Sequence, residues 1–345
     1  MAKHKCIYCL MEKNGDEFNR EHVVPRMMGT YEDGFVLSQN QVCQECNSFF
    51  SKELEDKIGL NSLESFLRIQ HGRKMSDGRI MRKGRVAFSG TSDIFKGLDF
   101  TPVVDSSNEE RMHFDISPRI GILENEEKNE YTYHNLDELP YALPEILQSI
   151  KGKKAGIITV GIEQDIAESA LKEKGYLATT YEYKNVPVTD LYNKSALATK
   201  ISFSIDSIVR RICAKTAFNY LCFSMGKDYV LKKNFDELRR YIRYGEWSNN
   251  LWFRYSIGAI SAVEMPNETA HVVGYMMYPD KDKWLICGCV TWFGELTYIF
   301  RFGDAGLNVG IVNILQSTKM ACFDNVNRVI TEDEAVYIYP GRNTE

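Results

Sequence analysis

Two Cys-x-x-Cys pairs, Cys6 with Cys9 and Cys43 with Cys46, limit how the first part of this 345-residue chain can fold. A single pair is weak evidence, since a redox-active pair has the same spacing. Two pairs that enclose the dipeptide Glu21-His22 are typical of a structural zinc site, because four thiolates fill the tetrahedral coordination sphere of Zn²⁺ and leave no open position. The spacing therefore predicts a four-cysteine zinc clamp.

The residues around the second pair predict two short strands and a helix. Residues 17–24 form an extended run that Pro25 ends, and residues 35–42 form a second one. Residues 44–58 carry apolar side chains at helical spacing, and Gly59 is expected to end that helix. The clamp is thus expected to hold a compact unit that presents the acidic residue and the histidine between the two pairs.

This stretch resembles the HNH (His-Me finger) endonucleases, in the subgroup with a four-cysteine zinc clamp. The resemblance rests on the two cysteine pairs, Arg20-Glu21-His22-Val23-Val24-Pro25, Gly29 and Val42-Cys43-x-x-Cys46-Asn47. It implies an N-terminal ββα-metal finger in which His22 is the general base, since imidazole titrates near neutral pH. It also implies that Glu21 and Asn47 bind a catalytic ion, and their oxygen ligands suit Mg²⁺ or Mn²⁺ better than Zn²⁺.

The chain departs from the family pattern at two positions. The asparagine that orients the base often lies five residues before the third cysteine, where this chain has Ser38, so we assign the orienting role to the nearby Asn40. A further helical ligand is expected four residues after Asn47, where this chain has Ser51, a weak ligand. The catalytic ion is then held mainly by Glu21, Asn47 and substrate phosphate, which predicts weak metal affinity without DNA.

Charge is unevenly distributed along the chain. The formal net charge of −5 argues against binding of nucleic acid by the whole surface. Residues 66–85, however, contain seven basic residues and one acidic residue, a pattern that fits phosphate contacts about as well as an ordinary solvated surface. The residues expected to contact nucleic acid flank the motif or belong to this basic run: Arg20, Arg26, Arg73, Lys74, Arg82 and Lys83.

The length of the chain predicts more than one domain, and its 44% hydrophobic content is that of a folded protein. We expect an α+β fold with an HNH nuclease domain at residues 1–75, a β-rich and then α/β region at 76–198, and a helical hairpin plus antiparallel sheet at 199–345. Alternatively, residues 76–345 form one regulatory or recognition domain. No apolar run is long enough to span a membrane and no signal peptide is present, so a cytoplasmic location is expected.

Two helices and a run of strands dominate the last region. The pattern predicts a long helix over residues 205–225 with Ser204 as its N-cap, and a second helix over residues 234–244. From residue 251 to about residue 312 the chain alternates in the manner of consecutive strands. We therefore expect an antiparallel meander that packs on a helical hairpin.

These features predict a metal-dependent HNH endonuclease that hydrolyses DNA phosphodiester bonds and contains a structural Zn²⁺ and a catalytic Mg²⁺ or Mn²⁺. The C-terminal region is expected to control cutting by recognising DNA, an activating nucleotide or a protein partner, as in an anti-phage defence or restriction effector. A homo-oligomer would supply two active sites for cutting both strands. The alternative is a catalytically silent, zinc-stabilised module that binds DNA or protein.

Overall fold

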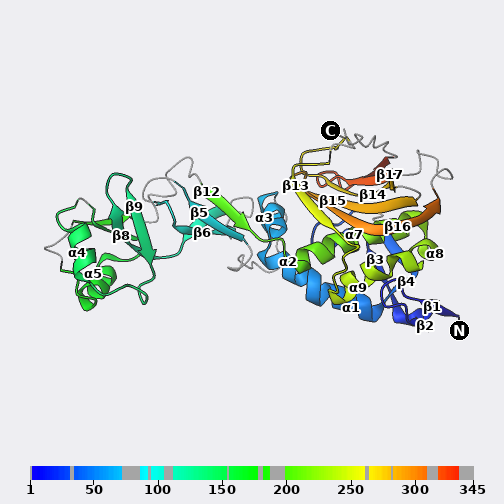
Figure 1. Ribbon diagram of the computed structural model, residues 1–345, viewed down its shortest axis with the longest axis horizontal. Coiled ribbons are helices and arrows are strands. Elements are labelled where there is room, and N and C mark those ends of the chain that lie inside the picture. The colour runs from blue at the N-terminus through cyan, green and yellow to red at the C-terminus, as the bar shows by residue number, and fades with distance from the viewer. Residues whose placement is uncertain are drawn as a thin grey trace. The chain divides into compact units, whose positions relative to one another are not determined.

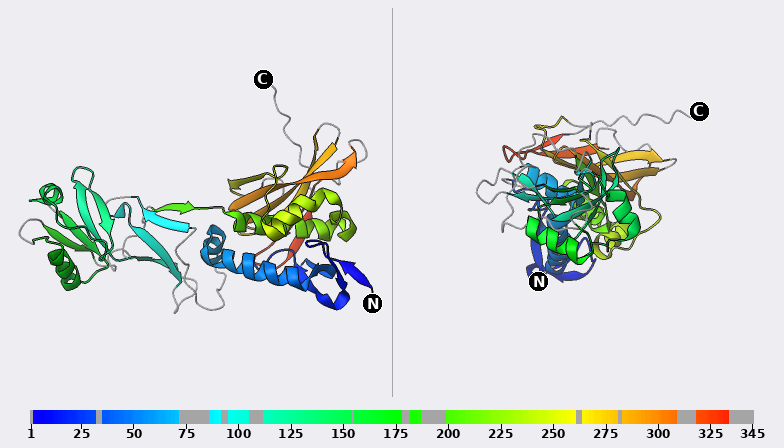
Figure 2. Two further views of the ribbon diagram at one scale, coloured as in Figure 1. Left: turned by 60° about the horizontal axis from the view of Figure 1, so that its bottom comes forward. Right: turned by 90° about the vertical axis from the view of Figure 1, so that its left-hand side faces the viewer.

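The chain divides into two compact units (Figure 1, Figure 2). Unit 1 contains Met1–Arg73 and Ile205–Glu345, and unit 2 contains Lys74–Ser204. The N-terminal residues therefore share a compact unit with the last part of the chain. The computed structural model describes residues 2–31, 35–71, 86–91, 95–104, 112–153, 155–177, 182–186, 199–260, 264–280, 283–308 and 318–333.

The N-terminal part of unit 1 is the predicted ββα finger. Strand β3 (Phe18–His22) pairs antiparallel with β4 (Val36–Cys43), and helix α1 (Gln44–Phe50) follows directly. A short hairpin of β1 (Lys3–Lys5) and β2 (Glu12–Asn14) carries the first cysteine pair in its turn. The finger and the α+β fold class predicted from the sequence are confirmed.

The helix of the finger is longer than predicted. After α1 it continues through a π-helical turn (Ser51–Glu55) into α2 (Asp56–Asn61), and α3 (Leu63–Gln70) follows. The prediction that Gly59 ends the helix is wrong, because Gly59 lies inside α2. The break comes at Ser62, whose side chain accepts a hydrogen bond from the Ser65 N–H and so caps α3.

The C-terminal part of unit 1 contains a six-stranded antiparallel sheet with the strand order β13-β16-β15-β14-β17-β18. Strands β14, β15 and β16 form the predicted antiparallel meander, but β13 pairs with β16 and not with β14. Two strands that the sequence pattern did not indicate, β17 and β18, continue the sheet beyond β14. The strands are β13 (Phe253–Ile257), β14 (His271–Asp280), β15 (Lys283–Trp292), β16 (Leu296–Asn308), β17 (Thr318–Phe323) and β18 (Ile330–Asp333).

A single long helix, α7 (Ser207–Met225), lies between this sheet and the finger (Figure 2). One side of α7 packs on β14 and β15, and another side contacts β4, α2 and the π-helical turn. Every residue from Ile212 to Cys222 is buried, as expected for a helix in the middle of a core. Neither α7 nor any other helix in the described ranges is long and apolar enough to cross a membrane.

The start of α7 differs from the prediction. Asp206, and not Ser204, is the N-cap, because its carboxylate accepts hydrogen bonds from the backbone N–H groups of Ile208 and Val209 at 2.9 and 3.1 Å. Strand β12 (Thr199–Phe203) ends just before Ser204, and the helix begins only at Ser207. After α7 come α8 (Lys227–Val230) and α9 (Asp236–Tyr244), and α9 packs against α7 to form the predicted hairpin.

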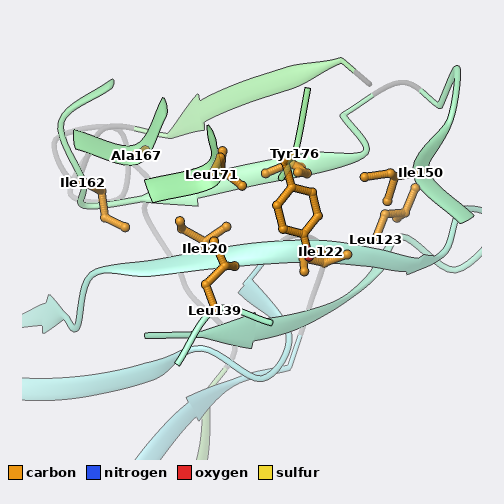
Figure 3. Packing of buried hydrophobic residues seen from close by; sticks show 10 residues of the cluster. Ile120, Ile122, Leu123, Leu139, Ile150, Ile162, Ala167, Leu171 and Tyr176 are labelled. Atoms are coloured by element: carbon orange, nitrogen blue, oxygen red, sulfur yellow. The ribbon is translucent and has the colours of Figure 1, made fainter. Parts of the chain in front are cut away.

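Unit 2 contains two four-stranded sheets, of order β12-β5-β6-β7 and β11-β10-β8-β9. Figure 3 shows the core of the second sheet, where Ile120 and Ile122 lie near Leu171 and Tyr176. Unit 2 therefore has a hydrophobic core of its own. Its elements are β5 (Val86–Gly90), β6 (Asp99–Val104), β7 (Met112–Ile116), β8 (Arg119–Asn125), β9 (Glu130–His134), α4 (Pro144–Ile150), β10 (Ile157–Val160), α5 (Gln164–Glu173), β11 (Tyr183–Val186) and β12 (Thr199–Phe203).

Candidate active site

The four cysteines of the two pairs come together as predicted. The Sγ atoms of Cys6, Cys9, Cys43 and Cys46 all lie within 4.8 Å of one another, and the Sγ atoms of Cys9 and Cys43 are 3.8 Å apart. Zinc–sulfur bonds of about 2.3 Å in a tetrahedron give a sulfur–sulfur distance of about 3.8 Å, so the cluster has the dimensions of a Cys₄ zinc site. The backbone N–H of Cys43 also points at Cys6 Sγ at 3.4 Å. These residues fit a structural Zn²⁺.

His22 is the last residue of β3, and its side chain is half-buried. Burial lowers the pKa of its imidazole, and the nearby charges of Arg26 and Arg20 lower it further. The neutral ring, which is the form that can accept a proton, is therefore favoured. No side chain in the described part of the chain hydrogen-bonds this ring, and the His22 backbone carbonyl accepts a hydrogen bond from Asn219.

Glu21 points to the side of β3 opposite to His22, because side chains alternate along a strand. Only 4% of Glu21 is exposed. Its Oε1 accepts a hydrogen bond from Asn219 Nδ2 at 3.2 Å and forms an ion pair with the ammonium of Lys215. Burial raises the pKa of this carboxyl, and Lys215 and Asn219 oppose that effect. Within the described residues no hydrogen bond reaches Oε2, so this oxygen is left for another ligand.

Lys215 and Asn219 are site residues that the sequence reading missed. The ammonium of Lys215 is fully buried, and it pairs with Glu55 at 2.7 Å as well as with Glu21. Burial alone would lower the pKa of Lys215, but the two carboxylates outweigh it and raise the pKa above its ordinary value. The sequence did contain a signal for these two residues. Lys215 and Asn219 lie at i+3 and i+7 from Ile212, so two polar residues occupy positions of the apolar stripe of α7 where core side chains are expected.

Asn47 lies in the first turn of α1, where its Nδ2 donates a hydrogen bond to the Arg20 carbonyl at 3.0 Å. This bond ties the start of α1 to β3, one residue before Glu21. Asn47 Oδ1 accepts no hydrogen bond from the described residues. Asn47 Oδ1 and Glu21 Oε2 are therefore two free oxygen donors on adjacent elements, a donor type that fits Mg²⁺ or Mn²⁺. Their role as metal ligands stays a prediction.

Asn40 lies where β4 bulges away from β3, with a positive φ of 58°. Its carbonyl accepts a hydrogen bond from Lys227 Nζ at 2.6 Å. Its side-chain amide lies beside Gly15, at 3.8 Å from the position of an added Cβ. The structure therefore does not bring the Asn40 side chain into hydrogen-bonding contact with His22, and its orienting role stays a prediction.

The side chains of Arg20 and Arg26, which flank the motif, are exposed. Neither guanidinium forms an ion pair with the described residues, so both remain available for an anion. The four other residues predicted to contact nucleic acid, Arg73, Lys74, Arg82 and Lys83, lie outside the described residues.

Comparison with known protein families gives one match in this part of the chain. Residues 6–63 match the family model described as HNH endonuclease. No curated protein and no solved structure matches the chain. The matched segment contains the four clustered cysteines, the Glu21-His22 dipeptide and Asn47, and it ends well before α7.

Proposed function

We propose that this chain, whose residues 6–63 form an HNH endonuclease finger, hydrolyses DNA phosphodiester bonds with the help of a divalent metal ion. One observation carries the proposal. His22 stands at the end of a strand that the zinc clamp holds, its neutral form is favoured, and two arginines without ion pairs in the described structure flank it. These are the groups that general-base attack on a phosphodiester requires.

In this mechanism the imidazole of His22 accepts a proton from the water that attacks phosphorus. Arg20 and Arg26 bind the phosphate oxygens and offset the charge that develops on them. A Mg²⁺ or Mn²⁺ ion held by Glu21 and Asn47 would supply stabilisation of charge at the leaving 3′ oxygen. That oxygen takes up a proton from solvent as it departs, which leaves a 3′-hydroxyl on one fragment and a 5′-phosphate on the other.

The test is cleavage of supercoiled plasmid by purified full-length protein in EDTA, Mg²⁺ and Mn²⁺. We expect metal-dependent nicking that His22→Ala abolishes and His4→Ala retains. His4 is a matched control because it is a histidine of the same finger, placed on β1 with its ring against Phe18. Zinc measured on the same samples is expected to stay at about one ion per chain in all three proteins. Equal cleavage by wild type and His22→Ala would refute the assignment of the base.

Unit 2 is the part of the chain to which we assign recognition or partner binding, because residues 205–345 share a compact unit with the finger and unit 2 has a core of its own. The proposed partners are DNA, an activating nucleotide or a protein, in a restriction or anti-phage defence effector, and the location is the cytoplasm. A zinc-loaded protein that binds DNA but does not cut it in any ion, alone or with such an activator, would support the silent binding module instead.

A further inference from the structure

Asn219 lies on α7, outside the matched residues, and yet its side chain contacts the two central residues of the finger. Its Nδ2 donates hydrogen bonds to Glu21 Oε1 at 3.2 Å and to the backbone carbonyl of His22 at 3.1 Å. Its Oδ1 accepts a hydrogen bond from the hydroxyl of Tyr8 at 2.5 Å. The fully buried amide is therefore used at both ends, and all of these partners belong to the finger.

Tyr8 connects this amide to the zinc clamp. It lies between Cys6 and Cys9, its backbone N–H points at Cys6 Sγ at 3.5 Å, and its ring packs edge-on against Phe50. Because the Tyr8 hydroxyl donates to Oδ1, the NH₂ group of Asn219 must face Glu21 and His22. The clamp thus fixes the orientation of the Asn219 amide.

Lys215 lies one helical turn before Asn219 and supplies the charge that Glu21 needs inside the core. Its ammonium shares Glu21 Oε1 with the Asn219 amide and also pairs with Glu55. A buried ion pair is weak evidence for stabilisation, since apolar side chains of similar volume often give equal or greater stability. Both α7 contacts fall on Oε1, and no hydrogen bond from the described residues reaches Oε2.

We propose that Asn219 is a positioning residue of the nuclease site. It fixes Glu21 so that Oε2 is presented to the divalent ion, and it fixes the His22 backbone so that the imidazole is held at the end of β3. This inference rests on the proposed function and extends the site to a helix outside the finger. Hydrogen-bond partners that orient metal ligands contribute roughly 10- to 100-fold to metal affinity or activity.

The test is Asn219→Leu in the full chain, because leucine has the same branched side-chain shape as asparagine and no hydrogen-bonding groups. Thr216→Val is the matched control, since Thr216 is buried on the same helix and its Oγ1 has no partner among the described residues. Mn²⁺ affinity is measured by electron paramagnetic resonance with DNA that carries hydrolysis-resistant phosphorothioate linkages. Turnover on ordinary plasmid gives kcat and KM, and zinc content and tryptophan fluorescence report folding.

We expect Asn219→Leu to bind Mn²⁺ roughly 10- to 100-fold more weakly and to lower kcat at saturating Mn²⁺, with KM for DNA and zinc content unchanged. Thr216→Val is expected to match wild type. A residue that only stabilised the fold would lower the unfolding midpoint without changing Mn²⁺ affinity in the folded protein. A folded Asn219→Leu protein with wild-type Mn²⁺ affinity and kcat would therefore overturn the inference.

If Asn219→Leu does not fold, Tyr8→Phe gives the same test, because it removes only the hydroxyl that orients the Asn219 amide. A smaller loss of Mn²⁺ affinity and kcat is expected, and wild-type values would overturn the inference. Failure of the proposed function looks different. In that case wild type and Thr216→Val themselves bind no Mn²⁺ and cut no DNA, and the inference fails with it.

Discussion

The buried histidine of the sheet, His271, makes the stability of unit 1 depend on pH. Its Nδ1 accepts a hydrogen bond from the Phe293 N–H at 3.0 Å, and its Nε2 lies 3.1 Å from the Met28 carbonyl, to which it donates. The ring is fully buried and packs edge-on against Trp292. Protonation of Nδ1 would remove its acceptor and leave two N–H groups facing each other. The folded state therefore requires the neutral imidazole.

Burial lowers the pKa of His271 from 6.5 to about 4; the hydrogen bond to the Met28 carbonyl opposes this effect, and the charge of the neighbouring His71 adds to it. Because the folded pKa lies below the unfolded one, the full stability is present above pH 6.5 and is lost as pH falls from 6.5 to about 4. The whole difference corresponds to about 3 kcal/mol, and about 2 kcal/mol of it is lost between pH 8 and pH 5. That is a large part of the typical unfolding free energy of a domain, which is about 5–15 kcal/mol.

Urea unfolding followed by tryptophan fluorescence measures this effect in unit 1 alone, since all four tryptophans lie in residues 247–292. We expect His271→Asn to be less stable than wild type at pH 8 and to approach it at pH 5, because only wild type loses the His271 contribution. His134→Asn removes a histidine from unit 2 and should keep the wild-type slope. A difference between wild type and His271→Asn that is the same at both pH values would refute the reasoning.

Three further substitutions test the stability of each unit by itself. Glu64→Gln should raise the melting temperature more at pH 8 than at pH 4.5, since burial raises the pKa of Glu64 above 4.5 and ionisation then costs stability; equal shifts would contradict this. Asp206→Ala should lower the unfolding free energy of unit 1 by about 1 kcal/mol through loss of the α7 cap, seen in the tryptophan urea midpoint. Leu171→Ala should cost unit 2 about 2–5 kcal/mol by calorimetry and leave the tryptophan transition unchanged.

The sequence predicted those parts of the site that depend on residues close together in the chain. Four cysteines at fixed spacing can form one metal site almost whatever surrounds them, and a strand, strand, helix pattern can be read from consecutive residues. The contact between Asn219 and Glu21 joins positions 198 residues apart, and no local pattern encodes such a pairing. The position of Asn40 shows the same limit, because a bulge in β4 decides where its side chain lies.

The cap of α7 and the end of α2 could not be placed from the sequence for a related reason. Ser204 and Asp206 are both good capping residues, and only in the folded chain does the Asp206 carboxylate meet the first free N–H groups of α7. Glycine frequently terminates helices, yet Gly59 lies inside α2, and the preceding residue of that helix, Ile58, is buried in the core of unit 1. In both places tertiary packing overrides the local preference.

Unit 2 joins unit 1 at two points along the chain, and one of them lies next to the start of α7. Unit 2 is an insertion within unit 1, because the chain enters unit 2 after α3 and returns to unit 1 just before α7. The second junction lies two residues before Asp206, the N-cap of the helix that carries Lys215 and Asn219. The proposed recognition module is therefore covalently joined to the helix that positions the proposed metal ligand and base.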